Sequence, residues 1–200
     1  MNRSNNEPYL QKNKKVFVVT IILLLILLAT NIYIYSQYNK VSENNRLIKF
    51  HLTDVILSHL PNEKDNIEGL ITIIASDKPP TEKTVNAQKY SNLVVIEESV
   101  DILLHTLDKE PEEWEVLLSL KNTLASLRSF LNQIDGYYGF MEQQPFELKN
   151  CGDARIEDEE DILNELNKFL EILDYPNASK LSWESFVAYW PLDNPYSCIY

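Results

Sequence analysis

The side chains of this chain that could do chemistry are a run of acids, three histidines and two cysteines. Residues 157–161 read EDEED, and clustered carboxylates can bind a hard cation such as calcium. A calcium loop alternates its oxygen ligands along the chain and turns at a glycine, and this run has neither feature. Because negative charge is favourable at the start of a helix, we expect the run to begin a helix and not to bind metal.

The histidines do not form a zinc signature. His51 and His59 are eight residues apart, near one face of a predicted helix, His105 lies far from both, and no HExxH motif occurs. A structural zinc site needs four ligands, usually at short, characteristic spacings. The sequence therefore predicts surface or core histidines, with no metal site and no cofactor.

Motifs for nucleophilic or phosphate chemistry are also missing. The four glycines, at positions 69, 136, 139 and 152, form neither a GxSxG elbow nor a phosphate-binding loop. Scattered carboxylates can still pair in three dimensions, so an envelope hydrolase remains a third hypothesis. We expect a protein that is not an enzyme, with no catalytic residues.

Cys151 and Cys198 form a candidate disulfide. Both follow the long apolar segment described below, so they lie on one side of any membrane that it crosses. A bond between them would close a loop of about 48 residues and stabilise the fold by roughly 4 kcal/mol in an oxidising compartment. The alternative is two unrelated reduced thiols.

Four aromatic residues near the C-terminus have helical spacing: Trp183, Phe186, Tyr189 and Trp190. Aromatic anchors of this kind dominate binding interfaces, so these four are the candidate interface residues. The alternative is that they pack on the open end of a helical bundle.

The elements that must position these residues begin with an apolar segment. Residues 16–35 contain no charged side chain and span 20 residues, enough for a helix to cross a hydrocarbon core of about 30 Å. The tail 1–15 carries four basic residues and one acid, which favours a cytoplasmic tail. A cleaved secretory signal is the competing interpretation, but Leu27 occupies a position where cleavage requires a small residue. We expect a retained signal-anchor.

The remainder of the chain is acidic. Of the 18 Lys and Arg and 30 Asp and Glu in the chain, four basic residues and one acid lie within 1–35, which leaves 14 basic and 29 acidic. Such a domain repels nucleic acid, because phosphate binding requires clustered Lys and Arg. Polar or cationic partners fit better.

Apolar periodicity predicts helices through most of this acidic part. We expect them at 41–60, ending at Pro61, at 93–107, from Pro111 to a stop near Gly136 and Gly139, at 157–173, and briefly after 181. The segment 67–75 could be helix or strand, and we interpret it as helix. The two helices joined near Pro111 should pack antiparallel.

Together these patterns predict an all-α protein: a tail at 1–15, a transmembrane helix at 16–35, a small extracytoplasmic helical bundle at 36–176 and an aromatic segment at 177–200 that packs on it. The favoured function is a single-pass cell-membrane protein that binds another membrane or envelope protein. The alternative is an accessory sensing subunit that binds a small molecule in a cavity between the helices.

Overall fold

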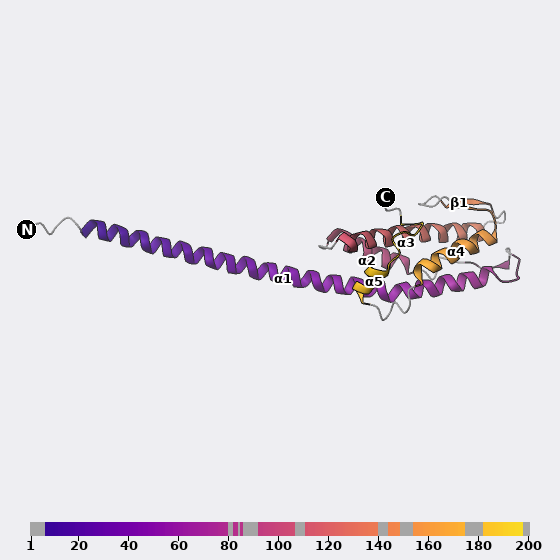
Figure 1. Cartoon of the computed structure of the whole chain (residues 1–200), viewed down its shortest axis with the longest axis horizontal. Coiled ribbons are helices and arrows are strands. Elements are labelled where there is room, and N and C mark those ends of the chain that lie inside the picture. The colour runs from indigo at the N-terminus through magenta and orange to yellow at the C-terminus, as the bar shows by residue number, and fades with distance from the viewer. Residues whose placement is uncertain are drawn as a thin grey trace, which may run out of the picture. The chain divides into compact units, whose positions relative to one another are not determined.

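Helices dominate the part of the chain that the structure, a computed structural model, describes: residues 7–79, 82–83, 85, 92–106, 111–139, 144–148, 154–174 and 182–197. The elements are α1 (Glu7–Ile74), α2 (Leu93–Thr106), α3 (Pro111–Gly139), β1 (Phe146–Leu148), β2 (Ala154–Ile156), α4 (Glu159–Leu173) and α5 (Trp183–Tyr189) (Figure 1). The chain divides into two units, Met1–Ile48 and Lys49–Tyr200, which are described separately. The predicted helical architecture is confirmed.

The first unit is the N-terminal part of α1. Its apolar side chains from Val16 onward are exposed, and the helix is long and apolar enough to cross a membrane. The polar side chains bond within the helix: Thr20 Oγ1 donates to the Val16 carbonyl at 3.0 Å, and Asn31 Nδ2 donates to the Leu27 carbonyl at 2.9 Å. Bonds of this kind satisfy polar groups where no water is present.

In the second unit, the prediction that a helix ends at Pro61 is wrong, because α1 continues through Pro61 to Ile74. A proline inside a helix lacks one backbone hydrogen bond and costs about 3 kcal/mol. An apolar stripe that spans the proline offsets this cost, since burying each of its side chains stabilises by about 1.5–3 kcal/mol. The stripe consists of Ile56, Leu60, Ile67, Leu70 and Ile74, all buried. The interpretation of 67–75 as helix is confirmed up to Ile74.

The helices α2 and α3 pack antiparallel, as predicted. Lys121 pairs with Asp101 at 2.5 Å and Arg128 pairs with Glu97 at 2.7 Å. The later residue of α3 thus pairs with the earlier residue of α2, as it must when two helices run in opposite directions. The helix α3 begins at Pro111 as expected, passes Gly136 and ends at Gly139. The apolar stripe of α3 faces the core, with Tyr138 partly buried and the others buried: Leu117, Leu120, Leu124, Leu127, Leu131 and Ile134.

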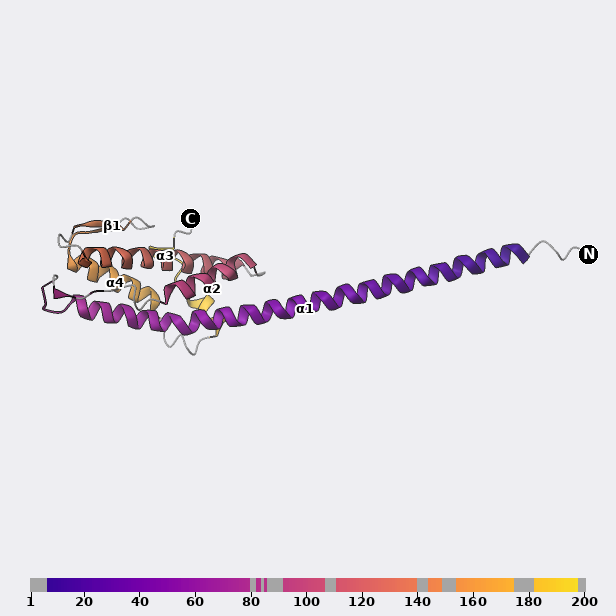
Figure 2. The ribbon, with the colours of Figure 1, turned by 180° about the vertical axis from the view of Figure 1, so that it is seen from behind.

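A short antiparallel hairpin, which the sequence did not predict, follows α3. Strand β1 pairs with β2 in the register Phe146↔Ile156, Glu147↔Arg155 and Leu148↔Ala154. Leu148 and Ile156 are buried, whereas Glu147 and Arg155 are exposed on the opposite face. Phe146 lies 6.1 Å from Phe130, between ring centroids, and both views show β1 beside the C-terminal half of α3 (Figures 1 and 2). Three-residue strands are too short to show a clear period in a sequence.

The helix α4 begins within the acidic run, as expected. Asp158 is the N-cap, and its side chain accepts hydrogen bonds from the backbone N–H groups of Glu160 and Asp161. The run therefore satisfies free N–H groups and complements the helix dipole. The apolar face of α4 is buried: Ile162, Leu166, Phe169 and Leu173.

Candidate interaction surface

Three of the four candidate interface aromatics lie in the core. Trp183, Phe186 and Trp190 are buried, whereas Tyr189 is 72% exposed. Ser182 caps α5 by accepting a hydrogen bond from the Ser185 N–H, and the resulting helix places Trp183 and Phe186 in a stack with ring centroids 5.1 Å apart. The structure thus brings three of these residues together inside the bundle and leaves Tyr189 on its surface.

The indole N–H groups of Trp183 and Trp190 donate hydrogen bonds to buried side chains of α3. Trp183 Nε1 donates to Glu113 Oε1 at 2.7 Å, and Lys49 Nζ from α1 donates to Glu113 Oε2, also at 2.7 Å. Trp190 Nε1 donates to Ser119 Oγ at 2.9 Å. The C-terminal segment therefore runs parallel to the first half of α3.

The residues after α5 continue this attachment. Asn194 Nδ2 donates to Ser119 Oγ at 3.2 Å, and its Oδ1 accepts from Thr123 Oγ1 at 3.2 Å and from the Tyr196 backbone N–H at 3.0 Å. Asn122 Nδ2 donates to the Ser197 carbonyl at 2.5 Å. Buried polar groups are costly unless they are paired, so this network fixes the path of the segment.

Tyr196 joins the same segment to α4. Its ring stacks on Phe169 with centroids 4.1 Å apart, and its hydroxyl donates a hydrogen bond to Glu165. Lys168 Nζ donates to the other oxygen of that carboxylate at 2.8 Å. Burial, together with the hydrogen bond and the charge of Glu165, raises the pKa of Tyr196, so the phenol stays neutral.

A second buried polar cluster, which the sequence did not reveal, joins three helix ends. Lys83 Nζ donates to the Ile74 carbonyl at the end of α1 at 2.5 Å and to Glu159 Oε2 at the start of α4 at 2.7 Å. Tyr138, near the end of α3, donates its hydroxyl to Glu159 Oε1 at 2.7 Å. These hydrogen bonds join the end of α1, the end of α3 and the start of α4.

Glu63 has a similar structural role. This carboxylate is buried on α1, and its Oε2 accepts the backbone N–H of Asn92 at 2.8 Å, just before α2 begins. The buried acids Glu63, Glu113 and Glu165 are thus each engaged by their own donors. Ser119 and Thr123 lie on an otherwise apolar face of a helix. Such polar residues were the signal in the sequence that could have indicated buried hydrogen-bond partners.

The histidines do not gather into a site. His51 is exposed on α1 with its ring beside Phe50, His59 is partly buried on α1, and His105 is exposed on α2. Among the residues that the structure describes, no group of three or more His, Cys, Asp or Glu is placed to hold a metal ion. The candidate disulfide partners Cys151 and Cys198 lie outside the described residues.

The clearest exposed apolar feature of the second unit is on α2. Val94, Val95 and Ile102 are 52%, 44% and 43% exposed, and a period of 3.6 residues places them on the side opposite the buried stripe. Glu98 and His105 share this side and are exposed. We call these five residues the outer face of α2. Three large aliphatic side chains in water on one face mark a binding surface more often than single exposed residues do.

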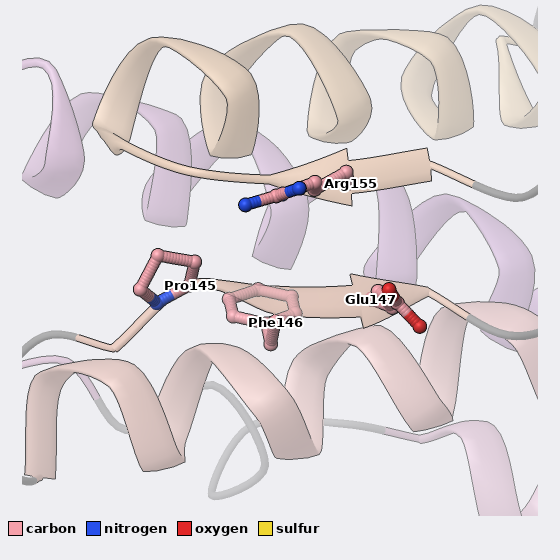
Figure 3. A pocket seen from close by; sticks show the side chains of 4 residues that line it. All are labelled: Pro145, Phe146, Glu147 and Arg155. Carbon is pink, nitrogen blue, oxygen red and sulfur yellow. The ribbon is translucent and has the colours of Figure 1, made fainter.

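A pocket of about 440 Å³ lies at the hairpin, lined by Pro145, Phe146, Glu147 and Arg155 (Figure 3). Both charged side chains belong to the exposed face of the strands, and Arg155 is paired with Glu157 at 3.0 Å. The pocket is therefore a surface feature with one carboxylate and one guanidinium. It does not lie between the helices.

The described residues thus form a helical bundle with a buried apolar core, preceded in the chain by a helix that is long and apolar enough to cross a membrane. No protein-family model matches the chain, and no curated protein or solved structure is significantly similar to it.

Proposed function

We propose that this chain is a non-enzymatic, single-pass membrane protein whose helical domain lies outside the cytoplasm and binds another membrane or envelope protein. The observation that supports this proposal most directly is the outer face of α2, where Val94, Val95 and Ile102 are exposed together. Covering such side chains removes apolar surface from water, which favours association.

The chemistry of this face describes the partner. Glu98 lies between the aliphatic side chains, and the domain carries a large excess of acids. A complementary surface would be apolar with a basic residue at its centre, because opposite charges align partners and exclude wrong ones. Tyr189 is a second exposed contact residue, on α5.

Sensing of a small molecule between the helices has less support. That function needs a cavity lined by several helices, and among the described residues Leu120, Leu124 and Leu127 of α3 and Leu166 and Phe169 of α4 belong to one buried apolar core. The pocket at the hairpin lies outside this core.

The test is chemical crosslinking of the full-length protein in its native membrane, followed by purification and mass spectrometry. The variant Val95→Glu/Ile102→Glu places charge on the outer face of α2, and Ile73→Glu is the matched control at an exposed apolar residue of α1. We expect one membrane or envelope protein to be recovered with the native chain and with the control, and several-fold less with the double variant. Equal recovery with all three, or recovery with residues 1–40 alone, would contradict the proposal.

The proposed orientation has its own test. The basic tail supports a cytoplasmic N-terminus, which places the domain outside. Protease added to intact cells or spheroplasts should digest the domain and leave an N-terminal tag intact. Digestion only after the membrane is disrupted would show the opposite orientation.

A further inference from the structure

The first unit carries an exposed face with a regular spacing of residues. Between the apolar span and Ile48, the helix places Tyr38, Val41, Asn45 and Ile48 at alternating spacings of four and three residues. This is the a and d pattern of a coiled coil. The three apolar members are exposed, at 69%, 56% and 45%.

The charges of this segment avoid that face. Lys40, Glu43 and Arg46 fall at the c, f and b positions of the same heptads, on the opposite side of the helix, and the flanking e and g positions hold Gln37, Ser42 and Asn44. Two copies of the face can therefore approach without like charges meeting.

The same heptads extend into the span, where the polar residues lie on the same side. Asn31 occupies an a position two heptads before Asn45, Thr20 occupies a d position, and Thr30 lies beside the face at g. Asn31 Nδ2 bonds to its own helix, and no described residue donates a hydrogen bond to its Oδ1. In lipid, side chains of this kind commonly bond across to a neighbouring helix.

We propose that the partner on this face is a second copy of the same chain, paired in parallel along Thr20 to Ile48. Copies of a single-pass protein enter the membrane in one direction, so their spans are parallel. In a parallel pair, each a residue meets its own equivalent, and an amide can pair with another amide because it both donates and accepts. Only an identical helix in register places amide against amide at both Asn31 and Asn45.

The test uses full-length chains with the native cysteines kept. Two copies carrying different tags are expressed together, and a photoreactive phenylalanine analogue is placed in turn at positions 40, 41, 43, 45, 46 and 48. We expect a product containing both tags to form several-fold more at 41, 45 and 48 than at 40, 43 and 46. A flat profile, a maximum on the charged side, or products containing only other proteins would overturn the proposal.

Variants at Asn31 give a second readout. Asn31→Leu removes the amide and should lower the yield of the two-tag product, while Asn31→Gln, which keeps an amide, should retain most of it. An unchanged yield with Asn31→Leu would overturn the role of the amide. Val95→Glu/Ile102→Glu should leave the profile intact, which separates this pairing from partner binding at α2.

Discussion

The Tyr196 hydroxyl donates a hydrogen bond to the buried carboxylate of Glu165, which ties the C-terminal segment to α4. Tyr196→Phe keeps the ring stack on Phe169 and removes only the hydroxyl. Because a buried acceptor loses a donor, we expect the free energy of unfolding to fall by about 1–3 kcal/mol. Urea unfolding of the full-length protein in mild detergent, followed by tryptophan fluorescence, measures this. Tyr189→Phe, at an exposed position, is the control and should change little.

Alkaline pH should weaken the same contact. Burial and the bond to Glu165 raise the pKa of Tyr196, and burial and the bond to Glu159 raise that of Tyr138. An unfolded tyrosine has a pKa of about 10. Since the folded state keeps its proton where the unfolded state loses it, stability is full below about pH 10 and falls as the pH rises above that value. The fall should be shallower in Tyr138→Phe/Tyr196→Phe, and an identical pH profile would refute this assignment.

Ser119 is the common acceptor for two buried donors, the Trp190 indole and the Asn194 amide. In Ser119→Ala both donors lose this acceptor, which should cost about 1–3 kcal/mol of stability and shift the Trp190 fluorescence. Ser58→Ala, at an exposed serine that bonds only to its own helix, should be nearly neutral. Equal losses in the two variants would show that the network is not responsible.

Lys83 should contribute more to the stability of the fold than a lysine whose ion pair is partly exposed. Lys83→Met keeps the apolar stem and removes the ammonium that bonds the Ile74 carbonyl and Glu159. Because Lys83 is buried and Glu159 is partly exposed, losing these two bonds should cost about 1–3 kcal/mol, and hydrogen exchange at the end of α1 should accelerate. Lys121→Met removes an ion pair with Asp101 between half-exposed side chains, for which about 0–1 kcal/mol is expected. If Lys121→Met lost as much stability as Lys83→Met, the burial of Lys83 would not explain the loss of stability in Lys83→Met.

Pro61 should lower the stability of the fold, because it lies inside α1. Pro61→Ala restores a backbone N–H that can bond to the Leu57 carbonyl, and alanine favours a helix by up to about 3 kcal/mol over proline. The urea midpoint should rise, with the buried stripe around Ile56 and Ile67 unchanged. A lower midpoint would mean that the proline fits a bend on which the packing depends.

Much of the fold follows from local patterns. The apolar span, the antiparallel pair α2 and α3, and the start of α4 at the acidic run were predictable because each depends on spacing and charge within a few helical turns. Pro61 misled the prediction because its local cost is outweighed by contacts that residues such as Ile67 make with distant parts of the chain.

The candidate surface was predicted only in part. The aromatic spacing after Ser182 correctly indicated a helix, but the same spacing fits an interface or a core. Trp183 and Trp190 are buried because Glu113 and Ser119, about 70 residues earlier in the chain, accept their N–H groups. A local sequence pattern cannot predict hydrogen bonds between residues so far apart in the chain.

The sequence by itself determined which segments are helical, where an apolar helix could cross a membrane, and how strongly acidic the remainder is, because these depend on residue type and spacing. Tertiary structure decided which polar residues are buried, that Phe146 and Ile156 pair in a hairpin, and that Val95 and Ile102 stay exposed while Phe186 does not. The reason is physical: burial and hydrogen bonding depend on what lies opposite a side chain, and that is set by residues far away in the chain.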